Sequence, residues 1–228
     1  MKAYALIPAY NEEKTIREVV SRVKKIGLHP LVVDDCSKDA TSRIAKKAGA
    51  TVLRHEINKG KGESIKTGFN YLLKKTPGVE YVVLIDADLQ YDPLEATRLL
   101  KPLQEKEADL VTGYRNWRIV PFRHKLGNFV WRNFFNILFG TNFKDTNCGF
   151  MALTKRSMKR VKSALHGGYI IENTLFIDAI KKGMRISQVP VTVKYKEKSG
   201  VSRGVRMVLG VLYFIFIEGM KHRVGVES

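Results

Sequence analysis

Two aspartates at the end of an apolar run carry the strongest chemical signal in the chain. The stretch YVVLIDADLQYDP, residues 81–93, leads from apolar residues into Asp86 and Asp88. In extended geometry such residues project to one side, and two close carboxylates repel each other unless a cation lies between them. With the side-chain oxygen of Gln90, these oxygen ligands favour Mg²⁺ or Mn²⁺. The alternative is a solvated turn that caps the helix after Pro93.

A second pair of carboxylates ends another apolar run, PLVVDD, at Asp34 and Asp35. One of them could accept hydrogen bonds from a nucleobase. In PAYNEE, after the first apolar run, Tyr10 would offer a stacking face and Glu12 an acceptor for a ribose hydroxyl. The plainer alternatives stay open: a capped turn at Asp34 or Asp35, and residues 11–13 as a helix start favoured by its dipole.

A glycine-flanked pair of lysines, Lys59 and Lys61 in NKGKGESIKTGF, precedes a predicted helix. The N-terminus of a helix presents N–H groups and the positive end of its dipole, which suits a phosphate. The spacing is not that of a Walker motif. The stretch therefore indicates phosphate contact without assigning a nucleotide class.

The elements that position these residues follow from the apolar pattern. Strands are predicted over 3–8, 30–35, 50–56, 80–88 and 108–115, and helices over 11–27, 37–49, 60–76 and 93–106. This alternation predicts an α/β fold, Rossmann-like, with a mostly parallel sheet covered by helices on both faces. Ligands of such sheets bind beyond the carboxyl ends of the strands, where three of the polar stretches would meet.

Length and charge narrow the classes of function. The 228 residues suit one sizeable domain, and the net charge of +18 attracts polyanions, phosphorylated substrates or an anionic membrane. No RRM, KH or zinc-finger signature accompanies the charge, so nucleic-acid binding is not the expected role. Cys36 and Cys148 lie far apart, and residues 1–10 lack a signal-peptide pattern, which favours a reduced intracellular setting.

The pattern changes after Arg115. Residues 120–140 mix aromatic and basic residues at helical spacing, and a helix over 169–183 and a strand over 185–195 follow. Arginines here could clamp a phosphate while the aromatic face lies at a membrane interface; an ordinary amphipathic core helix is the alternative. The candidate arginines are Arg115, Arg118, Arg123 and Arg132. A second group that could contact a phosphate lies in EKSGVSR and consists of Lys198, Ser199, Ser202 and Arg203. A solvated loop is the alternative for this second group.

The tail holds an apolar run over 207–217 with basic residues on both sides. This run is shorter than the roughly 20 residues that span a bilayer. It predicts an interfacial helix attracted to anionic headgroups. A helix docked on the core or on another subunit is the alternative.

Six motifs follow one another in the order and spacing of family 2 glycosyltransferases with the GT-A fold. They are PAYNEE, VVDDCSKDAT, NKGKGESIKTGF, DADLQYDP, GYR and DTNCGF. The chain resembles this family over about residues 3–203, most closely the polyprenyl-phosphate branch, the dolichyl-phosphate mannose and glucose synthases. It departs from the pattern at GYR, where serine more usually precedes the arginine, and transmembrane helices found in some relatives are missing.

The resemblance implies a nucleotide-sugar donor, a divalent metal and an inverting transfer. Carried over by motif, the nucleotide would be held by Pro8, Tyr10, Glu12, Asp35 and Asp86. The other residues expected at the donor are Asp34, Lys61, Ala87 and Asp88. The metal would lie at Asp86, Asp88 and Gln90, and the acceptor phosphate would meet Arg115, Arg118 and Arg123 and the 198–203 group. The donor expected is GDP-mannose, slightly favoured over UDP-glucose.

The role of Asp145 in DTNCGF depends on the acceptor. A sugar hydroxyl would require a general base, for which Asp145 is a contender. A lipid phosphate is already anionic, so Asp145 would instead position arginines or the acceptor, with Glu172 as a similar candidate. The residues expected to carry catalysis are Asp88, Asp145, Arg115 and Arg123.

These inferences define one expected protein: a GT-A domain over 1–203, with a nucleotide half (1–115) and an acceptor half (116–203), and a membrane-associating tail over 204–228. It would transfer a hexose from a nucleotide sugar to a polyprenyl or dolichyl phosphate, peripherally at the cytoplasmic membrane face. The alternatives are a soluble family 2 enzyme that glycosylates a saccharide, and a non-enzymatic basic module for nucleic acid or membrane.

Overall fold

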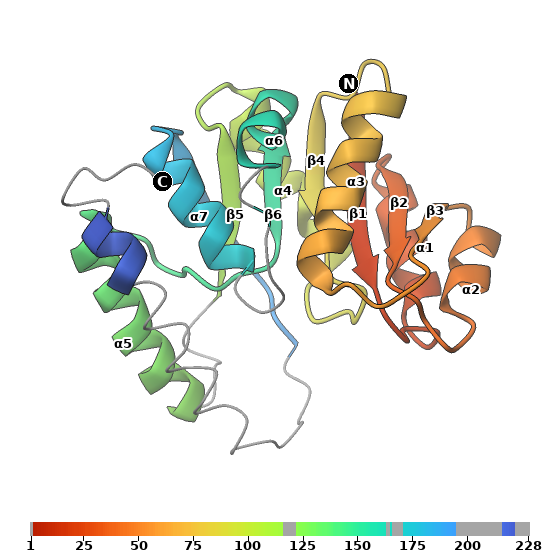
Figure 1. The fold of residues 1–228 in the computed structure, drawn as a ribbon, viewed down its shortest axis with the longest axis horizontal. Helices are drawn as coiled ribbons and strands as arrows, with labels where there is room; N and C mark the ends of the chain where they lie inside the picture. Colours follow the sequence, from red (N-terminus) through yellow and green to blue (C-terminus); the bar gives the residue numbers. More distant parts are fainter. Residues whose placement is uncertain (1, 116–121, 163–164, 166–170, 195–215, 222–228) are drawn as a thin grey trace.

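A seven-stranded sheet forms the centre of the protein (Figure 1). The computed structural model describes residues 2–115, 122–162, 165, 171–194 and 216–221, and for residues 122–128 the backbone alone. The strand order is β3-β2-β1-β4-β6-β5-β7. The strands are β1 Ala3–Ala9, β2 His29–Asp34, β3 Thr51–Arg54, β4 Tyr81–Leu84, β5 Leu110–Arg115, β6 Met151–Thr154 and β7 Ile186–Val191. Only β6 runs antiparallel to its neighbours, so the prediction of a mostly parallel sheet is confirmed.

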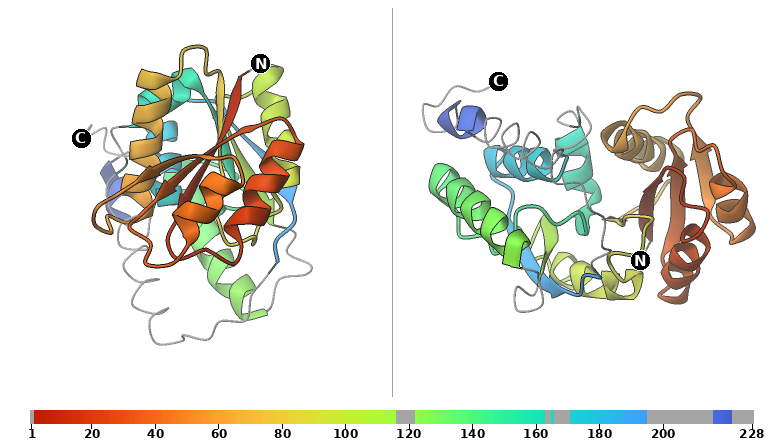
Figure 2. Two further views of the ribbon diagram at one scale, coloured as in Figure 1. Left: turned by 90° about the vertical axis from the view of Figure 1, so that its right-hand side faces the viewer. Right: turned by 90° about the horizontal axis from the view of Figure 1, so that it is seen from below.

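Helices cover both faces of this sheet, as predicted (Figure 2). One face carries α3 (Lys61–Lys75), α6 (Lys155–Val161) and α7 (Ile171–Lys181), and α5 (Phe122–Phe139) joins the same apolar cluster. The other face carries α1 (Ile16–Lys25), α2 (Thr41–Lys47) and α4 (Ala96–Gln104), the last preceded by the 3₁₀ turn η1 (Pro93–Glu95). The two apolar clusters, one on each face, support the sheet edge on which the site is built.

The apolar spacing of each helix explains why it packs where it does. In α1 the residues Ile16, Val19, Val20 and Val23 are all fully buried, which is the i, i+3, i+4, i+7 pattern of one helical face. On the opposite face α3 approaches β1 closely at Gly68, where a Cβ atom would lie 2.3 Å from the Leu6 Cδ1 atom. A glycine is required there because the strand leaves no room for a side chain.

Three differences from the sequence-based expectations bear on the site. The predicted strand over 80–88 ends at Leu84, so Asp86 and Asp88 lie in the loop after β4 and not in extended geometry. The helix predicted from residue 11 begins at Ile16. The strand β6 and the helix α6 were not predicted; β6 has only four residues, and its last residue, Thr154, caps α6 by accepting the Ser157 N–H with its hydroxyl.

The helical end of the described chain, residues 216–221, packs on α5 and α7. The rings of Phe134 and Phe216 stack with centroids 6.4 Å apart. A Cβ atom at Gly219 would lie 2.8 Å from the Leu138 Cβ atom, and Lys181 Nζ lies 2.6 Å from Glu218 Oε2. The apolar run predicted over 207–217 lies mostly outside the described residues, but its end is tied to the core.

Candidate active site

The carboxyl ends of β2, β1 and β4 lie side by side at one edge of the sheet, the lower edge in Figure 1. Ala9 pairs in register with Asp34, so the loops after β1 and β2 start at the same level, whereas β4 ends at Leu84, opposite Leu6 of β1. The prediction that three polar stretches meet at one edge is therefore confirmed. Parallel sheets place ligand sites at such an edge.

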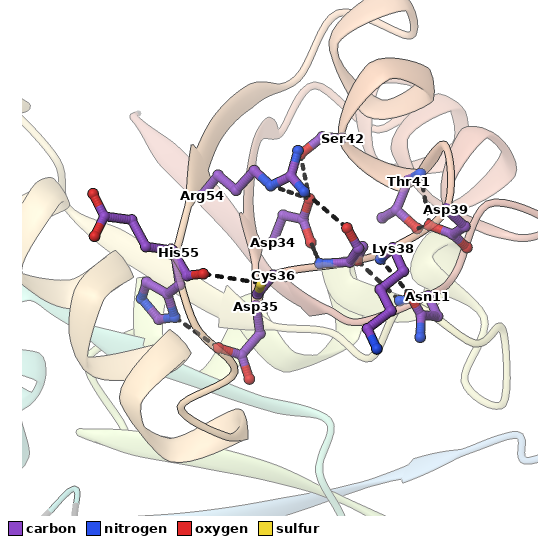
Figure 3. A network of polar contacts seen from close by, with 12 residues as sticks. Asn11, Asp34, Asp35, Cys36, Lys38, Asp39, Thr41, Ser42, Arg54 and His55 are labelled. Carbon is purple, nitrogen blue, oxygen red and sulfur yellow. Dashed lines mark hydrogen bonds and ion pairs between the residues drawn. The ribbon is translucent and has the colours of Figure 1, made fainter.

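Asp34 organises the loop between β2 and α2 (Figure 3). Its side chain is fully buried; Oδ1 accepts the Ser37 N–H at 2.9 Å, and Oδ2 accepts the Ser42 hydroxyl and lies 3.7 Å from Arg54 Nε. Asn11, after β1, accepts the Lys38 N–H at 2.8 Å and so joins the two loops. Burying a charge is costly unless it is paired, and here the chain's own donors pair it. Asp34 is thus an anchor of this edge.

Asp35 anchors the loop that leads into α3. Its Oδ1 lies 2.7 Å from His55 Nδ1 and accepts the Lys59 N–H at 2.8 Å, while Oδ2 accepts the Gly60 N–H at 2.7 Å. Figure 3 shows the His55 ring directed at this carboxylate. On its other side, His55 Nε2 lies 2.9 Å from the Thr67 hydroxyl. Sequence reasoning missed His55 as a site residue, although it lies near the end of the strand predicted over 50–56.

Tyr10 is the exposed aromatic group of this edge. Its side chain is 44 % exposed, which leaves a face for stacking, whereas Pro8 is part of β1. The Glu12 N–H donates to the Thr41 hydroxyl at 2.8 Å, and Glu12 Oε2 accepts the Thr15 hydroxyl at 2.8 Å. Glu12 therefore helps to begin α1, as the plainer alternative expected, and its predicted contact with a ribose stays a prediction.

Lys61 brings three charged groups from three elements together. Its Nζ lies 2.7 Å from Asp86 Oδ1, after β4, and 2.7 Å from Glu172 Oε1, in the first turn of α7. Burial alone would lower the pKa of Lys61, but the charges and hydrogen bonds of the two carboxylates raise it above its ordinary value. The ammonium group is therefore firmly charged. Its link to Glu172 spans 111 residues of sequence.

Gly149 closes this cluster from the DTNCGF segment. A Cβ atom at position 149 would lie 2.9 Å from Asp86 Oδ2, 3.1 Å from Glu172 Oε1 and 3.2 Å from Lys61 Nζ. Glycine lets the backbone lie against all three charged groups. The segment that sequence reasoning valued for Asp145 therefore also shapes the surroundings of Asp86.

Asp88 and Gln90 form a turn after Asp86. The Gln90 N–H donates to Asp88 Oδ1 at 3.0 Å, and Leu89 between them has a φ of 61°, in the left-handed region. The Gln90 carbonyl accepts the Lys194 N–H at 2.8 Å, which joins the turn to the chain after β7. Within the described ranges no three His, Cys, Asp or Glu side chains gather as a metal site.

Arg115 and Asp145 form a buried ion pair at the end of β5. Arg115 Nε lies 2.6 Å from Asp145 Oδ2, and its NH2 lies 2.9 Å from Oδ1, a two-pronged arrangement. Asp145 is 1 % exposed. Burial alone would lower the pKa of Arg115, but Asp145 raises it above its ordinary value. The Gln188 amide donates to the Asp145 carbonyl at 2.7 Å, which holds the pair against β7.

Most of the remaining predicted site residues are not placed. Arg118 and the group of Lys198, Ser199, Ser202 and Arg203 lie outside the described residues, and Arg123 lies in the part of α5 described by its backbone alone. Ala87 is buried beside Asp86, and Arg132 lies with its guanidinium 5.6 Å from the Phe129 ring centre. Of the residues predicted for the donor, Lys61 and Asp86 are in contact, and of those predicted for catalysis, Arg115 and Asp145 form a pair; their roles stay predictions.

The mostly parallel sheet with helices on both faces has the architecture of the GT-A fold. Solved structures of this type agree: glucosyl-3-phosphoglycerate synthase from Mycobacterium tuberculosis, crystallised with Mn²⁺ and UDP-glucose, superimposes with a TM-score of 0.76. The match is 23 % identical and covers 100 % of this chain and 80 % of that chain.

The chain belongs to glycosyl transferase family 2, whose family model matches residues 4–162. An uncharacterized protein of Methanocaldococcus jannaschii is 33 % identical, over 94 % of this chain and 99 % of its own length. The UDP-N-acetylglucosamine–dolichyl-phosphate N-acetylglucosaminyltransferase of Methanococcus voltae is 29 % identical, with 92 % of each chain covered. The polyprenol monophosphomannose synthase of Mycolicibacterium smegmatis is 29 % identical, over 89 % of this chain and 80 % of its own. The resemblance found in the sequence is confirmed.

No helix within the described parts of the chain is both long and apolar enough to cross a bilayer.

Proposed function

We propose that this glycosyltransferase moves a hexose, mannose in the first instance, from a nucleotide sugar to a polyprenyl phosphate at the cytoplasmic face of the membrane. The names of the dolichyl- and polyprenyl-phosphate relatives support the acceptor class. The observation that carries the proposal is the state of the two carboxylates that could serve as a base. Asp145 is bound by Arg115, and Glu172 is bound by Lys61.

This pairing favours an acceptor that brings its own negative charge. A saccharide hydroxyl must lose a proton to a nearby base as it attacks. A phosphate monoester oxygen is anionic near neutral pH and needs no such base. It would attack the anomeric carbon from the side opposite the diphosphate, forming a C–O bond as the bond to the nucleoside diphosphate breaks and that leaving group takes the electron pair. The product would then have the inverted configuration.

On the donor side, the proposal assigns one task to each group of residues. Tyr10 would stack on the base, and the Asp35-anchored loop would present Lys61 to the diphosphate. The family implies a divalent cation, and the residues present fit one, because the loop after β4 carries two carboxylates and an amide oxygen within five residues. Asp86, Asp88 and Gln90 would hold it with substrate phosphates, an oxygen-rich set that suits Mg²⁺ or Mn²⁺. When bound, such an ion stabilises the charge of the departing diphosphate.

On the acceptor side, Arg115 would meet the lipid phosphate, and Asp145 would keep its guanidinium in one orientation. An apolar surface lies on α5 and on residues 216–221. Its exposed side chains are Phe129, Val130, Ile137, Phe216 and Met220. Such a surface on a strongly basic protein suits contact with an anionic bilayer. We propose that this surface brings the enzyme to its lipid acceptor.

The reaction is tested with purified protein, Mn²⁺ and labelled donors: GDP-mannose, UDP-glucose and UDP-N-acetylglucosamine. Vesicles carry either a polyprenyl phosphate or the matching polyprenol, and a soluble oligosaccharide is offered separately. We expect label to enter the lipid fraction only with the phosphorylated lipid. Transfer to the saccharide alone, or equal transfer to polyprenol, would overturn the proposal.

A variant pair tests the acceptor role of Arg115. Arg115→Lys keeps the charge but loses the planar fork that Asp145 binds. Losing one charge-assisted hydrogen bond, about 1.5–3 kcal/mol, predicts at least about a tenfold fall in transfer to the lipid phosphate. Arg185→Lys, which alters a similar pair with Asp109 at the opposite end of β5, is the matched control and should transfer normally. A thermal unfolding curve checks that both variants fold, and normal transfer by folded Arg115→Lys would contradict the assignment.

A further inference from the structure

We propose that Lys61 is an internal cation that occupies the place of the divalent ion beside Asp86 until a donor diphosphate draws it away. Metal binding by this protein would therefore depend on prior or simultaneous binding of the nucleotide. The inference rests on the proposed function, because it concerns the donor side of the same site. It adds to that function the order in which the nucleotide and the metal bind.

The geometry shows that Asp86 already has a cation. Lys61 Nζ lies 2.7 Å from Asp86 Oδ1, which is the distance of a direct charge-assisted hydrogen bond. The same nitrogen lies 2.7 Å from Glu172 Oε1, so a second carboxylate holds it in position. The Lys61 side chain is 31 % exposed, and those of Asp86 and Glu172 are 28 % and 20 % exposed. The cluster is thus partly desolvated yet open to a ligand.

The backbone leaves little room for a second cation in the same cluster. Gly149 lies so close that a Cβ atom there would be within 2.9–3.2 Å of Asp86, Glu172 and Lys61. A divalent ion placed at Asp86 would lie near the Lys61 ammonium group and be repelled by it. Like charges at such distances interact strongly where water is partly excluded. The donor-free protein should therefore bind a divalent ion weakly.

A diphosphate would change this balance. Lys61 is the first residue of α3, and a helix N-terminus favours an anionic ligand. A donor diphosphate offers Lys61 more negative charge than Asp86 does. Once Lys61 turns to the diphosphate, Asp86 loses its cation, and carboxylate and phosphate oxygens together can hold the metal. Glu172 keeps its own hydrogen bond to Lys61 as a tether.

The test measures Mn²⁺ affinity without any sugar transfer. Electron paramagnetic resonance follows the signal of free Mn²⁺ as protein is added, first without nucleotide and then with saturating UDP or GDP. Wild-type protein should bind Mn²⁺ at least about tenfold more tightly with one of the two nucleotides, a coupling of about 1.4 kcal/mol. Lys61→Met, which removes the charge and keeps the length, should bind Mn²⁺ about tenfold more tightly than wild type when no nucleotide is present.

The adjacent lysine supplies the control. Lys59 is exposed, lies in the same loop just before Lys61, and donates its backbone N–H to Asp35. Because Lys59→Met keeps this N–H, it should leave the nucleotide-free affinity for Mn²⁺ unchanged. Lys61→Gln serves as a second variant if Lys61→Met folds poorly. Equal or weaker nucleotide-free binding by the folded Lys61 variants, or an equal gain in Lys59→Met, would overturn the inference. Either result leaves the transferase proposal standing, since that proposal fails on the acceptor assay.

Discussion

The neighbouring aspartates Asp34 and Asp35, at the end of β2, bind different loops. Asp34 holds the loop that leads to α2, and Asp35 holds the loop that leads to Lys61 and α3. Each of these carboxylates is buried, and its charge is balanced by hydrogen bonds from its own chain. Removing such partners leaves an unsatisfied charge, which costs about 1–3 kcal/mol or more. The pair thus shapes the donor edge, whatever further contact either residue makes with a base.

Cys148 shows how burial sets the chemistry of a single residue. Its thiol is completely buried behind the site, and burial, followed by the charge of Asp145, raises its pKa to about 12. The unfolded chain releases the same proton near pH 9, the ordinary value. Above pH 9 the unfolded state therefore binds fewer protons than the folded state, and stability must fall with rising pH.

We therefore expect the free energy of unfolding to decrease between pH 9 and pH 10.5, and part of this slope to disappear in Cys148→Ala. Urea unfolding at a series of pH values measures it. The matched control is Cys36→Ala, since Cys36 is partly exposed and should keep the wild-type slope. A Cys148→Ala protein with the same slope as Cys36→Ala would show that the thiol does not titrate as argued.

At the scale of elements, the contact between α3 and β1 decides whether Lys61 reaches Asp86. Gly68 in the middle of α3 lies against Leu6, and a Cβ atom there would overlap the Leu6 side chain. Replacing a mid-helix glycine by alanine ordinarily stabilises a helix by about 1 kcal/mol. Here the overlap should reverse the sign, since inserting a methyl group into a packed core costs about 1–3 kcal/mol.

Gly68→Ala should thus lower the free energy of unfolding, measured in urea, and weaken nucleotide binding as α3 shifts. Leu6→Val makes space at the same contact. In a double-mutant cycle the two changes should be less harmful together than the sum of the single effects. If the effects of the two substitutions on the free energy of unfolding simply add, or if Gly68→Ala is more stable than wild type, then the extra methyl group is accommodated without a shift of α3.

The elements most visible in the sequence are those with long, uniform apolar patterns. The strands β1, β2 and β4 are continuous apolar runs, and α1 has a full buried stripe, so both types were predicted. The strand β6 has four residues and inserts antiparallel between β4 and β5, an arrangement that no local pattern encodes. The contact of Lys61 with Glu172, and that of Asp35 with His55, arise from tertiary packing and were likewise not predicted.

At the scale of the whole molecule, the net charge and the exposed apolar residues both support the proposed contact with an anionic bilayer. The net charge of +18 gives long-range attraction to anionic surfaces, and this attraction weakens with added salt. The helix α5 and residues 216–221 lie side by side, away from β1 to β3 (Figure 2), and five exposed apolar residues belong to these two segments. An interfacial protein needs both features, because charge brings it to the bilayer and apolar side chains hold it there.

Substitutions of two nearly equally exposed isoleucines can separate the apolar contribution to membrane binding from the electrostatic one. Ile137 on α5 is 66 % exposed, and Ile57 in the loop after β3 is 65 % exposed. Ile137→Glu adds a charge within the proposed membrane surface, whereas Ile57→Glu makes the same change outside it. Both lower the net charge equally, so a purely electrostatic attraction would weaken alike in both variants. We expect Ile137→Glu to bind anionic vesicles at least about tenfold more weakly than Ile57→Glu in co-sedimentation, since losing about 60 Å² of buried apolar surface costs about 1.5 kcal/mol. Equal binding of the two variants would show that α5 does not enter the bilayer and that the basic surface alone attracts it.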